Sequence, residues 1–178
     1  MVGTIKVGKL QAADGTSNTI SLESGHKLSA SEGALSIPGT IVQVKEATTS
    51  GTIQSTSTSF VASGVVVSIT PKFQNSKFII QASGVSDYHT APGHNIQAKV
   101  YQKIGSGSYA NAHTGSGLIF YQIYGDNFGV AHYGKLILTP NTTSELSYQI
   151  YYKSSNGNGV YINAYGGQHV IQVMEVAQ

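Results

Sequence analysis

Cysteine and arginine are both absent from this 178-residue sequence, and each absence narrows the range of functions. Without cysteine, the chain cannot form a disulfide framework, a thiolate metal site or a cysteine nucleophile. Without arginine, all ten basic residues are lysines, which lack the planar fork of donors that binds phosphate best. Since the formal net charge is only +2 and the lysines are scattered, we expect no nucleic-acid partner.

Charged residues and long apolar runs are also scarce. Only 10% of the residues are charged, against about 25% in a typical soluble domain, so hydroxyl, amide and glycine residues must supply most of the polar surface. No apolar run approaches the roughly 20 residues of a membrane-spanning helix, and the opening MVGTIKVGK lacks the apolar core of a secretion signal. We therefore expect no membrane insertion.

Segments with strand character occupy most of the chain after residue 40. They alternate apolar and polar residues or are rich in β-branched and aromatic types, and Gly, Pro, Asn and Ser separate them. No stretch has the apolar spacing of a helix, so the sequence predicts an all-β fold, an antiparallel sandwich of jelly-roll type. The expected strands are Ile41–Ala47, Ser59–Thr70, Ser76–Ser83, Ile96–Ile104, Leu118–Tyr124, Val130–Leu138, Glu145–Tyr152, Val160–Asn163 and His169–Val176.

Two segments resemble each other and predict matching corners. SITPKFQNSKFIIQAS, from Ser68, and LTPNTTSELSYQIYYKS, from Leu138, each contain a strand, a Thr-Pro pair, a polar turn and a second strand. A proline removes a backbone donor and holds the preceding residue extended, which suits a strand that leaves its sheet. Two such corners are typical of paired Greek keys, although similarity by chance is an alternative at this length.

Residues 1–38 differ from the rest, since they contain only short alternating pieces separated by Gly or Asp turns. A few isolated strands cannot form a core in one copy, so we expect three identical chains to wind together into a stem, ahead of a β-sandwich head at 39–178. The alternative is an arm that lies on the flank of its own domain. The apolar residues of the predicted stem are Ile5, Val7, Leu10, Ile20, Leu22, Leu28, Leu35 and Ile37.

Three blocks carry a family resemblance: GTIKVGKLQ with NTISLESGHKLS, TSFVASGVVVSITPKFQNSKFIIQASG, and the ending GGQHVIQVMEVAQ. In strand and turn pattern the sequence resembles tail-fibre-like structural proteins of bacteriophages, particularly of phages that infect marine bacteria. The resemblance implies a homotrimeric component of the virion, on its tail or capsid surface, that contacts other virion proteins through residues 1–38. It does not place the protein as a fibre tip, spacer, knob or capsid decoration.

Catalytic and metal sites are poorly supported. Asp87, His89 and His94 share the stretch SDYHTAPGHN, but two histidines on a Pro- and Gly-bearing loop have no fixed geometry, so solvated side chains are expected and no metal is predicted. No nucleophile-elbow pattern occurs, and Glu46, Glu145 and Glu175 fall at positions that indicate exposed strand faces or ends. We expect a protein that is not an enzyme and has no cofactor.

Binding through loops is the stronger hypothesis. Tyrosine offers a flat apolar ring with a polar tip, which suits contact with a host-surface glycan or a protein receptor, whereas tyrosines within strands are expected simply to pack. The predicted receptor-binding residues lie in loops at 87–95, 105–117 and 124–129. They are Asp87, Tyr88, His89, His94, Asn95, Tyr109, Asn111, His113, Tyr124, Asp126 and Asn127.

Three functions remain open at this point. The first is a fibre or knob protein whose head attaches to the host, and the second is an architectural subunit such as a capsid decoration or fibre spacer. An adhesin should present its loops freely, whereas an architectural subunit should bury them against neighbours. The third is a secreted lectin-like module, which would be monomeric because it has no use for a trimeric stem.

Overall fold

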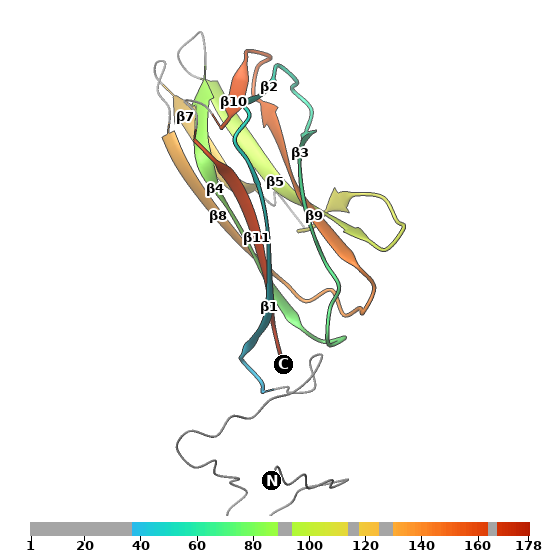
Figure 1. Ribbon diagram of the computed structural model, residues 1–178. Coiled ribbons are helices and arrows are strands. Elements are labelled where there is room, and N and C mark those ends of the chain that lie inside the picture. The colour runs from blue at the N-terminus through green and yellow to red at the C-terminus, as the bar shows by residue number, and fades with distance from the viewer. Residues whose placement is uncertain (1–36, 89–93, 114–117, 125–129, 164–166) are drawn as a thin grey trace, which may run out of the picture. The chain divides into compact units, whose positions relative to one another are not determined.

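The computed structural model describes residues 37–88, 94–113, 118–124, 130–163 and 167–178 (Figure 1). The chain divides into two units, residues 1–35 and 36–178, and all of the described residues belong to the second. Apart from Ile37, the apolar residues of the predicted stem therefore lie outside the described residues. The trimeric winding of residues 1–38 stays a prediction.

The described residues form strands and contain no helix that is long and apolar enough to cross a membrane. The strands are β1 (Ile41–Thr49), β2 (Ile53–Ser55), β3 (Val61–Ile69), β4 (Lys77–Tyr88), β5 (His94–Ile104), β6 (Ala110–Asn111), β7 (Leu118–Tyr124), β8 (Val130–Leu138), β9 (Leu146–Ser154), β10 (Val160–Ile162) and β11 (His169–Val176). Nine of them correspond to the nine predicted strands, with ends that differ by up to five residues. The two short strands β2 and β6 were not predicted, because three and two residues are too few to show a periodic pattern.

These strands form a jelly roll of two antiparallel sheets (Figure 1). Sheet A has the order β1-β11-β4-β10-β2, with β8 on the other side of β4, and sheet B has the order β3-β9-β5-β6, with β7 also paired to β5. The chain pairs from its ends inward: β1 with β11, β3 with β9, β4 with β8 and β5 with β7. This nested pairing divides the strands between two sheets as two Greek keys do, so the predicted fold class is confirmed.

The core lies between the two sheets and follows the period-two alternation of the strands. In β3 every second residue from Val65 to Ile69 is buried, and β11 alternates in the same way from His169 to Glu175. Each large apolar side chain removed from water here contributes about 1.5–3 kcal/mol. The clustered core residues are Val65, Val67, Ile69, Phe78, Ile80, Ala82, Ile96, Ala98, Val100, Leu146, Tyr148, Ile150, Tyr152, Val160, Ile162, Ile171 and Val173.

The two predicted corners are confirmed, since each one carries the chain from one sheet to the other. Pro71 follows β3 of sheet B and precedes β4 of sheet A, and Pro140 lies between β8 of sheet A and β9 of sheet B. Asn141 adopts a φ of 52°, the left-handed conformation that asparagine tolerates in turns. Each proline therefore lies where the preceding strand stops forming backbone hydrogen bonds with its neighbour.

Glu175 corrects the prediction of an exposed carboxylate, because its side chain is fully buried beneath the first corner. Its carboxylate accepts hydrogen bonds from the backbone N–H groups of Lys72 (2.8 Å) and Phe73 (3.2 Å), from the Ser76 hydroxyl (2.6 Å) and from the Gln43 amide. The corner brings donors that would otherwise be unpaired to one point, and a carboxylate satisfies them together. The alternation of the sequence did not predict this role of Glu175. Alternation indicates which face of the strand a residue lies on, but not which backbone donors a distant turn brings to that face.

Candidate functional site

Four of the predicted receptor-binding residues lie in strands and not in the expected loop. β4 continues through Asp87 and Tyr88, and β5 begins at His94 and Asn95. Asp87 pairs with Tyr161 of β10, and His94 pairs with Tyr124 of β7. Pairing with β10 extends β4, and pairing with β7 extends β5, beyond the positions where Gly and Asp indicated a turn. The loop predicted at 87–95 is therefore longer than the connection between the two strands.

The other predicted receptor-binding residues divide between described and undescribed parts of the chain. His89, Asp126 and Asn127 lie outside the described residues, and Tyr124 is the last residue of β7. Tyr109, Asn111 and His113 lie on or just after the hairpin that joins β5 to β6, and Asn111 pairs with Tyr101 of β5. Of the eleven predicted residues, Tyr109 and Asn111 are the ones that the described structure places beside a surface suited to binding, namely the outer face of sheet B.

We call this face the aromatic-lysine surface. The Tyr101 and Tyr151 rings stack with centroids 3.9 Å apart and planes 18° apart, and the Tyr109 ring lies 6.2 Å from that of Tyr151. The stack arises because Lys99 is opposite Tyr151 in the register, so Tyr101 is its diagonal neighbour on the same face. The surface comprises Phe60, Lys99, Tyr101, Lys103, Tyr109, Tyr151 and Lys153.

The lysines of the aromatic-lysine surface lie against its rings. The Nζ atoms of Lys99 and Lys153 are 4.9 Å and 5.1 Å from the centroid of the same Phe60 ring, and the Nζ of Lys103 is 5.6 Å from that of Tyr109. Cation–π contacts of this kind contribute about 0.5–1 kcal/mol at exposed sites and hold the ammonium groups in place. The surface therefore combines aromatic rings with positive charges that lie close to them.

The strand tyrosines were expected simply to pack, and they do so in different places. Tyr148 and Tyr152 are buried on the inner face of sheet B, but Tyr101 and Tyr151 are partly exposed on its outer face, and Tyr133 is 60% exposed on sheet A. The sequence signal that distinguishes the buried tyrosines from the exposed ones is the odd or even position of each along its strand. Residues 99, 101 and 103 alternate with buried 98 and 100, and 151 and 153 alternate with buried 150 and 152.

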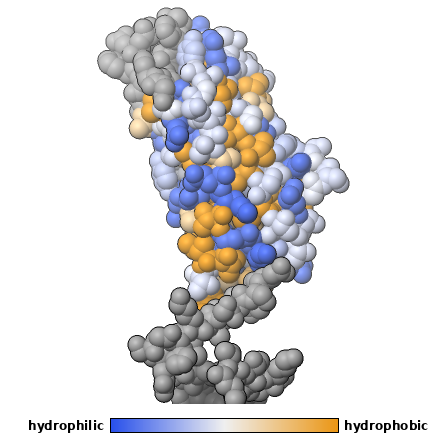
Figure 2. All heavy atoms as spheres, in the orientation of Figure 1, coloured by the Kyte–Doolittle hydropathy of each residue, from blue (hydrophilic) through white to orange (hydrophobic). Residues whose placement is uncertain are grey.

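A row of apolar side chains crosses the outer face of sheet A. Val44 pairs with Met174, Met174 with Ile79, and Ile79 with Ile137, so these four residues, the apolar row, span β1, β11, β4 and β8. Val44 is 48% and Ile137 is 52% exposed in the single chain. Figure 2 shows hydrophobic atoms open to solvent along the side of the domain where β1 and β3 lie.

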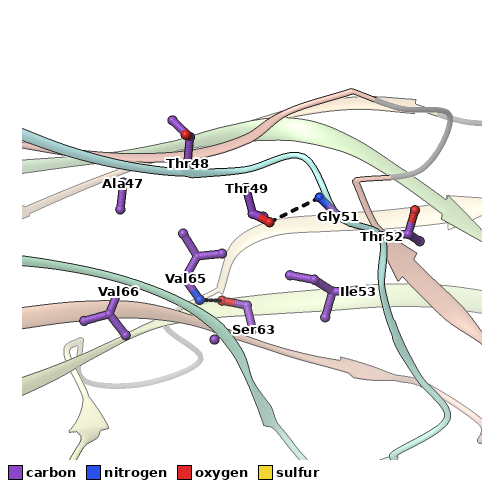
Figure 3. Close-up of a pocket in the computed structure, with 10 residues that line it drawn as sticks. Ala47, Thr48, Thr49, Gly51, Thr52, Ile53, Ser63, Val65 and Val66 are labelled. Carbon is purple, nitrogen blue, oxygen red and sulfur yellow. Dashed lines mark hydrogen bonds between the residues drawn. The ribbon is translucent and has the colours of Figure 1, made fainter.

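A groove of about 560 Å³ separates the facing edges of the two sheets, between β1 and β2 on one side and β3 on the other (Figure 3). Ile53 and Val65 point into it, whereas the side chain of Thr48 points away. On the β3 side, the register shifts between Ala62 and Val66, and Gly64 has a φ of 80° that suits a bulge. None of its lining residues is charged, so it offers few groups to orient a ligand.

Two histidines are buried side by side on the inner face of sheet A. The ring centroids of His132 and His169 are 5.7 Å apart, and Gly84 of β4 lies between their strands without a side chain to block them. The pKa of each lies at about 4, below the usual 6.5; burial is the main cause for both, and the neighbouring His169 contributes to the lowering at His132. The described residues provide no third His, Asp or Glu in reach, so this pair does not make a metal site.

Comparison with known proteins assigns the chain to no family. No model of a protein family matches the sequence, and no curated protein is similar to it. A structure of the VP2 subviral particle of infectious bursal disease virus is 10% identical with a TM-score of 0.45, covering 77% of this chain and 34% of that chain. A T13 particle of the same virus is 12% identical with a TM-score of 0.40, covering 90% and 40%.

A carbohydrate-binding structure is also similar in fold. The CBM22-1 xylan-binding domain of Xyn10C from Paenibacillus barcinonensis is 13% identical with a TM-score of 0.33, covering 81% of this chain and 99% of that chain. The structures similar to this chain thus include viral capsid proteins, of which it spans about a third to two fifths, and a β-sandwich domain. With TM-scores below 0.5, these matches give the chain neither a family nor a function.

Proposed function

We propose that the protein is a structural component of a virus particle, a phage tail-fibre or tail-knob subunit whose trimeric β-sandwich head attaches to the host surface. The observation that carries the proposal is the apolar row on sheet A. Monomeric proteins seldom leave a continuous apolar band of this kind in water, whereas subunits of lasting assemblies do so until a neighbour covers it. Ile37, where the predicted stem joins the domain, is also 50% exposed.

The aromatic-lysine surface favours attachment over a purely architectural role. It lies on the outer face of sheet B, which is the face of the sandwich opposite the apolar row. A subunit that buries sheet A against its neighbours can therefore still present sheet B outward. Exposed tyrosines with neighbouring lysines suit recognition of glycans or proteins, and they are not required to complete the core.

The second candidate is an architectural subunit without adhesive function, such as a capsid decoration protein or fibre spacer. The apolar row favours it as strongly, because every assembly subunit needs such a contact. The two candidate functions differ in whether the outer face of sheet B is exposed on the intact particle. An architectural subunit buries it against other particle proteins, and labelled antibodies against sheet B would then fail to bind intact particles.

The proposal is tested by charging the apolar row in the full chain. We expect the unaltered protein to have three times the 18.7 kDa mass of one chain in light scattering, and Val44→Asp with Ile137→Asp to lower that mass because a charge cannot be buried unpaired in the contact. Val66→Asp is the matched control, since Val66 is 40% exposed on sheet B. A monomeric unaltered chain, or an unchanged mass in the double variant, would contradict the proposal.

A further inference from the structure

We infer that the aromatic-lysine surface binds an acidic polysaccharide, whose sugar rings lie on the tyrosines and whose carboxylate or sulfate groups pair with the lysines. The inference rests on the proposed attachment role and names the ligand class of that role. It places the site mainly on sheet B and its adjoining hairpin, where the stack of Tyr101 and Tyr151 lies, and not mainly in the loops that sequence analysis favoured.

The tyrosines provide the contact for the sugar rings. Tyr101 and Tyr151 stack on each other and are both partly exposed, so the pair offers aromatic area at the surface to a sugar ring. Because the stack already restricts the two side chains, less side-chain entropy is lost on binding than for isolated tyrosines. The neighbouring strand β3 contributes Ala62, Val66 and Ser68 to this face, and none of the three carries a charge or an aromatic ring.

The lysines provide the preference for negative charge. The ammonium groups of Lys99 and Lys153 share one Phe60 ring, so they lie within about 10 Å of each other, which is a Debye length at 0.1 M salt, and both act on the same anion. None of the outward-facing residues described on β3, β5 and β9 is acidic. In the free protein the two charges repel each other without a counter-charge, and an acidic group between them removes that repulsion.

A polysaccharide fits this surface better than a nucleic acid does. Regular phosphates are gripped best by guanidinium forks, and the chain contains no arginine. Asn111 lies beside Tyr101 in the register, and its exposed amide suits the hydroxyl groups of a sugar. The surface thus presents aromatic rings, an amide and separate lysine charges. These groups are complementary to a polysaccharide in which neutral hydroxyl groups alternate with acidic groups.

The test measures binding of the full chain to oligogalacturonate and to dextran sulfate by calorimetry, with an uncharged glucan oligomer as comparator. We expect both acidic probes, or one of them, to bind, and Tyr101→Ala to weaken binding about tenfold. Replacing Lys99 and Lys153 together by Gln is expected to weaken it about fivefold in low salt and less at 1 M salt, because screening already weakens the charge term. The matched controls are Tyr133→Ala and Lys135→Gln, the same residue types exposed on sheet A, which should leave affinity unchanged.

Separate outcomes would overturn the inference. Equal binding of the uncharged glucan, equal losses in the sheet A controls, or a single-stranded oligonucleotide that binds more tightly than either acidic probe each contradicts it. Tyr151→Phe keeps the ring and should keep binding, so a loss there, with an unchanged melting temperature, also contradicts it. An unaltered chain that is trimeric but binds neither acidic probe disproves this inference alone, whereas a monomeric chain that binds them disproves the virion role alone.

Discussion

The two sheets of the sandwich have the same pleat but differ in the ionisable groups that they bury and in the side chains that they expose. Sheet A buries His132, His169 and Glu175 on its inner face and exposes the apolar row on its outer face. Sheet B buries Tyr148 and Tyr152 with aliphatic residues, and its outer face carries rings and lysines. Sheet A also supplies apolar core residues such as Phe78, Ile80 and Ile171, so it differs from sheet B in its buried ionisable groups and in its exposed apolar row.

This difference is consistent with separate roles for the outer faces of the two sheets. The outer face of sheet B carries partly exposed rings and lysines that the core does not require. Sheet A buries ionisable groups, of which Glu175 has several hydrogen-bond partners, and it exposes the apolar row, which a neighbouring molecule covers in the proposed function. Three changes test this difference between the sheets, and the first has the largest expected effect.

Acid should destabilise sheet A before sheet B. Between pH 6.5 and 4 the unfolded chain binds protons at His132 and His169 that the folded chain does not bind, so stability falls as the pH falls through this window and is constant above it. Each histidine contributes at most about 3 kcal/mol to the change. Burial raises the pKa of Tyr152 to about 12 and raises that of Tyr148 as well, so the inner face of sheet B stays neutral throughout.

Denaturant unfolding of the full chain from pH 8 to 4 measures this effect, and hydrogen exchange shows whether β8 and β11 lose protection before β9. Replacing His132 and His169 together by Leu should flatten the dependence, whereas His113→Gln, at an exposed position, should not. Stability that stays constant down to pH 4 in the unaltered protein would refute the prediction.

Removing the charge of Glu175 should loosen the corner through which the chain passes from sheet B to sheet A. Glu175→Gln replaces an acceptor of several hydrogen bonds by a group that itself donates two, and the expected loss is about 3 kcal/mol in the free energy of unfolding. Urea unfolding at pH 7 measures it. Glu46→Gln is the control, because Glu46 is exposed and accepts a bond from Gln172; equal effects at the two positions would show that burial of Glu175 is unimportant.

Adding one methyl group at Gly84 should cost less. A Cβ there would lie 3.1 Å from the Gln168 carbonyl oxygen and 3.2 Å from both His132 Cε1 and His169 Cα. Because a side chain yields more easily than backbone, we expect Gly84→Ala to displace the His132 ring at a cost of about 1–2 kcal/mol. NMR titration should then find the pKa of His132 closer to 6.5, because the ring gains solvent. Gly51→Ala, where the nearest atom is 3.8 Å away, should change neither quantity.

Much of the fold could be predicted from the sequence, because alternation and turn residues act locally. Nine strands and both corners at Pro71 and Pro140 follow from patterns within a few residues. The candidate site was predicted less well. The search for binding residues favoured loops, so it found Tyr109 and Asn111 but passed over Tyr101 and Tyr151, whose exposure depends on which face of sheet B points outward.

By itself, the sequence determined the fold class, the absence of cysteine and arginine chemistry, and the places where the chain turns, since these depend on residue type and near neighbours. Only the tertiary structure decided which polar groups meet. The burial of Glu175 under a corner a hundred residues away, the pairing of His132 with His169 across Gly84, and the stack of Tyr101 on Tyr151 all depend on register between strands that are distant in the chain. No local pattern encodes that register, because it is set by how the two sheets close on a shared core.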